Sequence, residues 1–317
     1  MVKTNKKSLL LTMLVVLFSA MLLVGGLAIA GNKPQVDSKV SAEGTSATLL
    51  ERTGNWDTGW LAELGYSIAG NLIITTDSSK IPNDYVKEVD VSAEKNGSLI
   101  AYIINSDVSY KYNCIIYGNV DTICAPENSQ YLFYCYHTSM HSITTITFEN
   151  FDTSNVTNMR SMFSYTEVLT ELDLRRFDTR KVEDMTAMFN LSLALTKLDI
   201  SSFVINSNTL TENMFGENMN SLEFLYAPAE CNQTIALPKI MYFEGTDTAV
   251  TALSSATNGK VLCSTPNTYA PVRESLDAEV PATGFDMNEI VLTTTLGVTL
   301  LVAIAVVFGK TKKSIKR

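Results

Sequence analysis

The middle of the chain carries an apolar pattern that repeats every 26 residues. A phenylalanine recurs at Phe151, Phe177 and Phe203. Three Met-Phe pairs recur at the same step: Met162-Phe163, Met188-Phe189 and Met214-Phe215. Three apolar triplets do so as well, and a fourth, incomplete copy contributes one more triplet: Ile143, Ile146, Phe148; Leu169, Leu172, Leu174; Leu195, Leu198, Ile200; Leu222, Leu225, Ala227. A fixed period of this size is typical of repeat proteins, in which no single copy buries its apolar face alone. The pattern therefore predicts a stack of three and a half copies around one continuous core.

Within each copy, two local patterns predict two elements. Leu172 and Leu174 alternate with Asp173, and this period of two indicates a short strand. The apolar residues 156, 159, 162 and 163 are spaced like one face of a helix, and good N-cap residue types stand at 152–154. We therefore expect an α/β fold, a short leucine-rich-repeat solenoid with one strand and one short helix per copy, because the period lies in the range of such repeats.

The flanking segments read as β-rich caps. Leu72–Ile74 and Leu99–Ile104 are apolar runs that indicate strands. The segment before the spacer is rich in Thr and Ser, and the spacer itself contains three prolines among sparse apolar residues. The expected organisation is a signal peptide (1–30), an N-terminal β-rich region (31–110), the solenoid (111–228), a C-terminal β-cap (229–265), a spacer with a sorting motif (266–289) and a transmembrane helix with a basic tail (290–317).

The N-terminus has the features of an export signal. Lys3, Lys6 and Lys7 precede an apolar run over residues 9–24, and Ala28-Ile29-Ala30 has the small-x-small form that a signal peptidase recognises. Cleavage before Gly31 is the favoured interpretation, and an uncleaved membrane anchor is the alternative.

The C-terminus predicts a membrane span with the body of the protein outside the cell. Ile290 to Phe308 is an uncharged apolar stretch long enough to cross the hydrocarbon core. A basic tail (Lys310, Lys312, Lys313, Lys316, Arg317) follows it and is expected to stay in the cytoplasm.

Just upstream, Val280-Pro281-Ala282-Thr283-Gly284 resembles the LPxTG-type sorting signal of Gram-positive bacteria, with Val280 in place of Leu. The resemblance implies that a sortase cuts after Thr283 and joins it to a cell-wall amine, so that Gly284 is the first residue lost. Pro281 pre-sets the backbone at the motif, and Gly284 leaves the scissile carbonyl accessible to a thiolate. The alternative is a type I membrane protein whose PxTG motif has no role.

The repeat itself resembles the BspA-like leucine-rich-repeat surface proteins. Their "FDTSNVTNMxxMF…LTxLDLSxF" pattern stands here at Phe151–Phe163 and Leu169–Phe177, and Ile116–Phe133 resembles the segment that these proteins place before their first repeat. The resemblance implies surface display and a broad link with adhesion. It implies no catalytic residue.

Charge excludes one class of partner. Residues 31–284 hold 16 basic and 31 acidic residues, a net charge of −15. Nucleic-acid binding needs clustered Lys and Arg, so no nucleic-acid partner is expected.

The reactive side chains give little indication of an enzyme. The five cysteines all lie in the exported part, where disulfides can persist. Cys114 with Cys124, and Cys231 with Cys263, are the pairings we predict, and Cys135 is left free because the repeat family often carries a buried Cys there. His137 and His141 lie in a loop-like sequence without a neighbouring carboxylate, so no metal site is expected. No cofactor or nucleophile motif is present in the sequence.

The best candidate for ligand binding is the outer face of the strands. Side chains that point away from the core line up in three rows across the copies: Thr145, Glu171, Lys197, Phe224; Thr147, Asp173, Asp199, Tyr226; and Glu149, Arg175, Ser201. Glu171 should pair with Lys197 and Glu149 with Arg175, while the like-charged Asp173 and Asp199 offer oxygens to a cation or to sugar hydroxyls.

We therefore expect a non-enzymatic, adhesin-like binding module on the bacterial envelope, with an extracellular protein or glycan as its partner. A structural spacer without a dedicated ligand is the alternative. A hydrolase within residues 49–110 is a third hypothesis, which the absence of histidine from that segment disfavours.

Overall fold

The computed structural model describes residues 45–52, 59–64, 68–106, 112–135, 143–216 and 218–273. The chain divides into two compact units, residues 1–270 and 271–317. The predicted signal peptide, His137 and His141, the sorting residues Pro281, Thr283 and Gly284, and the apolar span from Ile290 lie outside the described residues. Of the second unit, only residues 271–273 are described, and these three residues form no helix or strand.

The first unit begins with a five-stranded mixed sheet. Its strand order is β3-β4-β5-β2-β7, in which β2 lies parallel to β5 and β7, and β4 lies antiparallel to β3 and β5. The strands expected at Leu72–Ile74 and Leu99–Ile104 are confirmed as parts of β2 and β4. The elements of this part are β1 (Ser46–Thr48), α2 (Trp60–Leu64), β2 (Ile68–Thr75), η1 (Ser78–Lys80), β3 (Lys87–Asp90), β4 (Leu99–Asn105), β5 (Tyr112–Gly118), β6 (Thr122–Cys124), β7 (Thr145–Phe148) and β8 (Phe151–Asp152).

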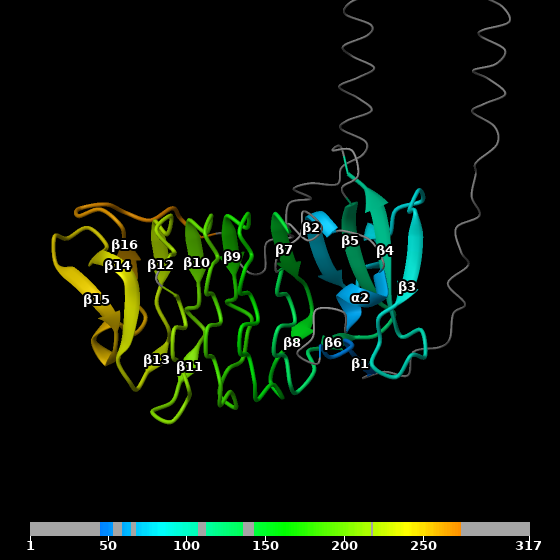
Figure 1. Ribbon diagram of the computed structural model, residues 1–317, viewed down its shortest axis with the longest axis horizontal. Coiled ribbons are helices and arrows are strands. Elements are labelled where there is room, and N and C mark those ends of the chain that lie inside the picture. The colour runs from blue at the N-terminus through cyan, green and yellow to red at the C-terminus, as the bar shows by residue number, and fades with distance from the viewer. Residues whose placement is uncertain are drawn as a thin grey trace, which may run out of the picture. The chain divides into compact units, whose positions relative to one another are not determined.

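The 26-residue copies follow as three stacked turns of the chain, which we call coil 1 (143–168), coil 2 (169–194) and coil 3 (195–220) (Figure 1). The strand of coil 1, β7, pairs with β2, so the N-terminal sheet adjoins the start of the stack. The strands β9 (Glu171–Asp173), β10 (Lys197–Asp199) and β12 (Phe224–Tyr226) pair in parallel, with Leu172, Leu198 and Leu225 in register. The sequence period thus sets the register of the stack.

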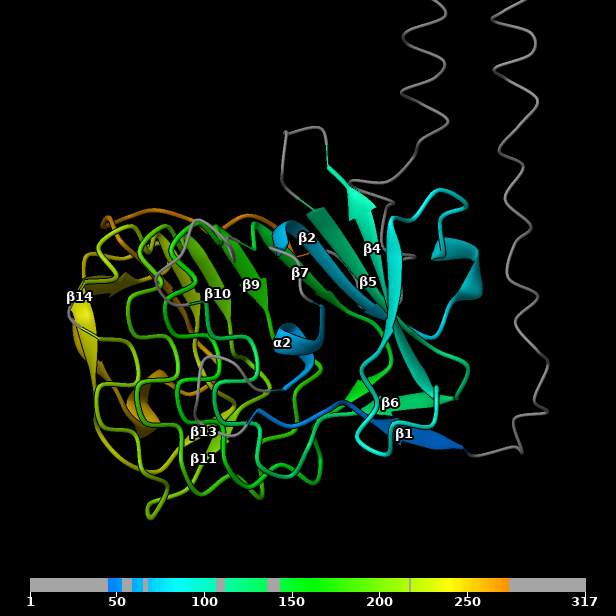
Figure 2. The same cartoon turned by 45° about the vertical axis from the view of Figure 1, so that its right-hand side comes forward.

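The C-terminal strands close the other end of the same sheet, whose order is β15-β14-β16-β12-β10-β9 (Figure 1). In the turned view, β14 lies at the end of the coils opposite to the N-terminal sheet (Figure 2). Here the pairing becomes antiparallel, and the pairing of β14 with β15 is irregular between Ala236 and Met241. Two smaller parallel sheets, β1-β6-β8 and β11-β13, lie at other corners of the coils. The remaining elements are β11 (Val204–Ile205), β13 (Glu230–Cys231), β14 (Ile235–Phe243), β15 (Ala249–Leu253), η2 (Ser255–Thr257) and β16 (Val261–Cys263).

The expected α/β solenoid with one helix per copy is wrong. Within the described residues, α2 is the one α-helix, and residues 153–168 and 179–194, where helices were expected, contain turns. The backbone N–H of Met159 bonds to the carbonyl of Asp184 at 2.8 Å, and that of Met185 to the carbonyl of Leu210 at 2.7 Å, across neighbouring coils. Ser161 has φ 53° and Ala187 φ 55°, a left-handed conformation that interrupts a right-handed helix. The fold is therefore mostly β-strands and turns.

The interior is one apolar cluster that runs through the coils. Its central feature is a column of stacked aromatic rings in which Phe133, Phe163, Phe189 and Phe215 lie with successive centroids 5.4, 6.0 and 5.9 Å apart. The prediction that the Met-Phe stripe packs in the core is confirmed, because all of these side chains are buried. Ring stacking between identical positions of adjacent coils adds to the burial of apolar area.

Candidate functional site

The first predicted row lies across three strands with its side chains in register. Lys197 stands beside Glu171 on one side and Phe224 on the other. The Lys197 Nζ lies 3.3 Å from Glu171 Oε2, and the two side chains are 28% and 64% exposed. Phe224 is half-buried, opposite Cys263 of β16. This row therefore offers a carboxylate, an ammonium and an aromatic ring along one line of the surface.

The second predicted row is largely closed to solvent, which corrects the expectation of an open face there. Asp173 is exposed, but Asp199 and Tyr226 each have only 3% of their surface exposed. Arg175 lies near all three of these residues. Its Nη2 is 2.6 Å from Asp173 Oδ2, and its Nε is 3.6 Å from Asp199 Oδ2. The single guanidinium of Arg175 thus offsets the repulsion between the carboxylates of Asp173 and Asp199, which were predicted from the sequence to be neighbours.

The aspartates of this row also have a local structural role. Asp173 Oδ1 accepts a hydrogen bond from the backbone N–H of Arg175 at 3.0 Å, and Asp199 Oδ1 accepts one from the N–H of Ser201 at 3.0 Å. A side chain that accepts a bond from the residue two positions ahead forms an Asx turn. These carboxylates therefore shape the corner after each strand and are less available to a cation or a sugar.

The electrostatics of the row follow from the same contacts. Partial burial by itself would raise the pKa of Asp173, but hydrogen bonds from Arg175 and the charges of Arg175 and Lys197 together hold that pKa below its ordinary value. The side-chain hydrogen bonds with Asp173 raise the pKa of Arg175 in return. The pair therefore stays ionised at neutral pH.

The third row does not form the predicted pair. Glu149 forms an ion pair with Lys80 of η1 and accepts a hydrogen bond from Thr75 Oγ1 at 2.6 Å. Arg175 turns instead toward the second row. No pattern in the sequence pointed to Lys80, because this residue lies outside the repeat and is brought close to Glu149 by the pairing of β2 with β7.

The predicted disulfides are not formed, because all five cysteines carry free thiols. Cys114 is buried in β5, and Cys124 lies in a different sheet. Burial raises the pKa of Cys135 to about 12, despite a backbone hydrogen bond and the nearby charge of Arg52, so its thiol is a poor nucleophile. In the described ranges, no group of three or more His, Cys, Asp and Glu side chains is arranged to hold a metal ion.

Comparison with known proteins adds one match, and it falls on the coils. Residues 130–224 match a family model described as "Mycoplasma protein of unknown function, DUF285". The match runs from the segment before coil 1 to the first residue of β12, so it includes Glu171, Lys197 and Phe224. Neither the curated proteins nor the solved structures gave a match. None of the described helices is long and apolar enough to cross a membrane.

Proposed function

We propose that this protein is a non-enzymatic binding module displayed on a bacterial envelope, and that it contacts an extracellular protein or glycan. The observation that supports the proposal is the register of Glu171, Lys197 and Phe224 across three strands. Parallel strands lie about 4.8 Å apart, so three different chemical groups recur at a fixed spacing along one surface line. Such an array suits a surface that recognises an extended ligand.

Export and anchoring belong to the same proposal. The basic and apolar segments of residues 1–30 fit a signal peptide, and the motif around Thr283, followed by the apolar span and the basic tail, fits sortase-mediated attachment. The resemblance of the repeats to BspA-like surface proteins supports display outside the cell. Mature protein should therefore begin at Gly31 and be recovered from the envelope.

The binding row can be tested with glycan and matrix-protein arrays probed with the full chain. Lys197→Ala and Phe224→Ala should each weaken binding to any ligand found. The control is Arg160→Ala, which changes an exposed residue of a turn outside the strand row. If the control variant loses binding and the two row variants keep it, the row is not the binding surface.

Attachment can be tested separately. In a host with a sortase, Thr283→Ala should move the protein from the wall fraction to the membrane fraction. Unchanged fractionation would leave the type I membrane arrangement, in which the apolar span alone holds the protein.

A structural spacer is the second candidate function, and one observation favours it. Charged groups of the strand face pair with one another: Lys197 with Glu171, and Arg175 with both Asp173 and Asp199. A face whose charges are satisfied internally can serve to keep the stack soluble and regular. If neither Lys197→Ala nor Phe224→Ala changed binding to any ligand on the arrays, the result would favour this role.

A further inference from the structure

The last complete coil ends in an open row of backbone donors. Between coils, alternate residues donate their N–H groups to the following coil: Met185, Ala187 and Phe189 donate to the carbonyls of Leu210, Glu212 and Met214 at 2.7, 2.9 and 2.8 Å. The equivalent donors of coil 3, one period later, are Thr211, Asn213 and Phe215. Within the part of the chain that the structure describes, none of these three N–H groups has a hydrogen-bond acceptor.

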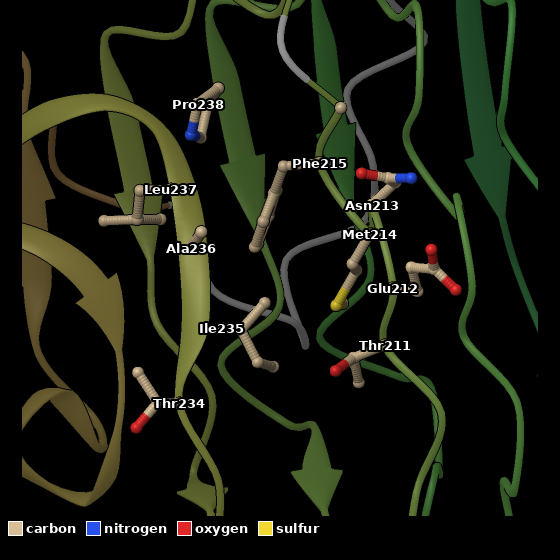
Figure 3. A pocket seen from close by; sticks show the side chains of 11 residues that line it. Thr211, Glu212, Asn213, Met214, Phe215, Thr234, Ile235, Ala236, Leu237 and Pro238 are labelled. Carbon is tan, nitrogen blue, oxygen red and sulfur yellow. The ribbon is translucent and has the colours of Figure 1, made fainter.

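The donors lack acceptors because the chain leaves the path of the coils. One period after Leu210 stands Ala236, in the first half of β14. This part of β14 does not form the expected ladder with coil 3. A cavity of about 400 Å³ separates the two segments, lined by residues 211–216 on one side and 234–238 on the other (Figure 3). We call this cavity the end slot.

A polar side chain, that of Gln233, binds coil 3 just before the segment of the chain that lines the end slot. The amide nitrogen of Gln233 donates to the carbonyls of Asn206 and Thr209, each at 2.9 Å, and its amide oxygen accepts from Thr211 Oγ1 at 3.0 Å. A side chain thus replaces the missing coil just before the open row begins. Beyond it, the lining combines apolar Met214, Phe215 and Ile235 with exposed Glu212.

We infer that the end slot binds an extended peptide segment of a partner, which enters as an added strand between coil 3 and β14. Donors on every second residue match the carbonyls along one edge of an extended chain, the arrangement used in β-strand addition. The exposed carboxylate of Glu212 and the acidic balance of residues 31–284 favour a peptide that carries lysine or arginine. This site is separate from the row Glu171–Lys197–Phe224 and does not depend on the function proposed for that row.

Amide exchange in the full chain tests the open row before any ligand is known. The amides of Met185, Ala187 and Phe189 should exchange slowly, because each bonds to the next coil. Those of Thr211, Asn213 and Phe215 should exchange much faster. Equal protection of the two sets would show that the row is already filled, and the inference would fail.

Peptide selection then tests the ligand. Random decapeptides displayed on phage would be selected against the full chain, and the selected sequences should be rich in basic and β-branched residues. Each should slow exchange at Thr211, Asn213 and Phe215. Ala236→Trp, which fills the slot from β14, should weaken binding about tenfold or more. Ala249→Trp, at an exposed position of β15 outside the slot, is the matched control.

Three outcomes would overturn the inference. Selection can yield no peptide that binds the full chain. The selected peptides can bind without protecting the three amides. They can also bind Ala236→Trp and Ala249→Trp equally well, which would place them on another surface; in that case the end slot holds solvent only.

Discussion

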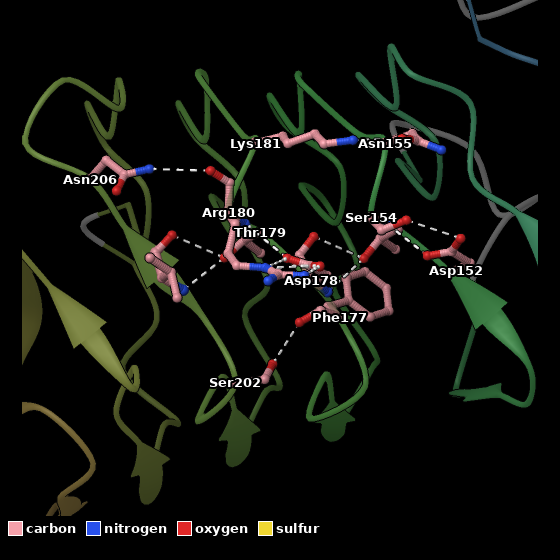
Figure 4. A network of polar contacts seen from close by, with 12 residues as sticks. Asp152, Ser154, Asn155, Phe177, Asp178, Thr179, Arg180, Lys181, Ser202 and Asn206 are labelled. Atoms are coloured by element: carbon pink, nitrogen blue, oxygen red, sulfur yellow. Dashed lines mark hydrogen bonds and ion pairs between the residues drawn. The ribbon is translucent and has the colours of Figure 1, made fainter.

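Thr153 and Asp178 exchange two hydrogen bonds across neighbouring coils. Figure 4 shows Asp178 and Thr179 within this network of polar contacts. The Thr153 hydroxyl donates to the Asp178 carbonyl at 3.1 Å and accepts from the Asp178 N–H at 2.8 Å. Thr179 repeats this exchange with Val204 one coil later, at 3.0 and 2.8 Å. Both threonines are at most 1% exposed, so each satisfies the backbone of the next coil at a corner that water does not reach.

Replacing this hydroxyl with a methyl group should destabilise the stack. Thr153→Val keeps the shape of the side chain but leaves the Asp178 N–H and carbonyl without their partner. We expect a loss of about 1–3 kcal/mol in the free energy of unfolding, measured by urea denaturation. Thr170→Val, at an exposed position of coil 2, is the control and should stay within about 0.5 kcal/mol. Equal stability of both variants would contradict a structural role for the exchange.

Leu172 tests the core of the stack. Its side chain is 2% exposed and stands in register with buried Leu198. Leu172→Ala should therefore cost about 2–5 kcal/mol, through lost burial and the cavity that it leaves. Glu171→Ala, one residue earlier on the same strand, should change stability by about 0.5 kcal/mol or less. Similar denaturation midpoints for the two variants would mean that the strand faces are assigned the wrong way round.

Arg175 should stabilise the fold in a pH-dependent way. It holds the pKa of Asp173 below the ordinary value of 3.8, so this stabilisation is present above that value and is lost as the pH falls through the folded-state pKa. Arg175→Met should lower the unfolding free energy by about 1–3 kcal/mol near pH 7, because Asp199 also loses an ion-pair partner. The loss should shrink as the pH falls from 7 through the folded-state pKa of Asp173, where that carboxylate takes up a proton.

Thermal unfolding of the wild type and of Arg175→Met across this pH range measures the effect. Lys181→Met, an exposed substitution in the same coil, controls for the general change in net charge. A difference between wild type and Arg175→Met that stays constant with pH would mean that the arginine acts through packing alone.

The free cysteines make a chemical prediction. Protein that is denatured without a reductant should yield five reactive thiols per chain, because all five are free. In the native state, burial raises the pKa of Cys114 above its ordinary value, so that thiol should react only after unfolding, and half-buried Cys124 should react first. Titration with a disulfide reagent gives both results. A count of one thiol would instead support the two disulfides predicted from the sequence.

Much of the stack could be predicted from the sequence because the period is fixed by burial. Leu172, Leu198 and Leu225 must each face the interior, and a short strand turns alternate residues to opposite sides. The register of these strands and the burial of the Met-Phe stripe both follow from the need to bury the apolar positions of every copy. Both are confirmed.

The form of the connecting segments was decided by the tertiary structure. Apolar residues three and four apart fit a helix face, but they also fit the corners of a coil whose N–H groups bond to the next coil. The spacing of Val156, Met159 and Met162 cannot distinguish these cases, because the acceptor lies 25 residues away at Asp184. Only the stacked chain shows that the hydrogen bonds run between coils.

The candidate sites were likewise predicted in part from the sequence and decided in part by the tertiary structure. The alternation of Glu171 and Leu172 on one strand, and the repeat of Lys197, are enough to place the first row on the outer face. The closure of the second row depends on Arg175, whose long side chain can reach several neighbours. From the sequence, this arginine was predicted to pair with Glu149 instead. The end slot was invisible for a related reason. It exists where β14 departs from the coil path beside Thr211, and a break in stacking is a property of two segments in space rather than of either sequence.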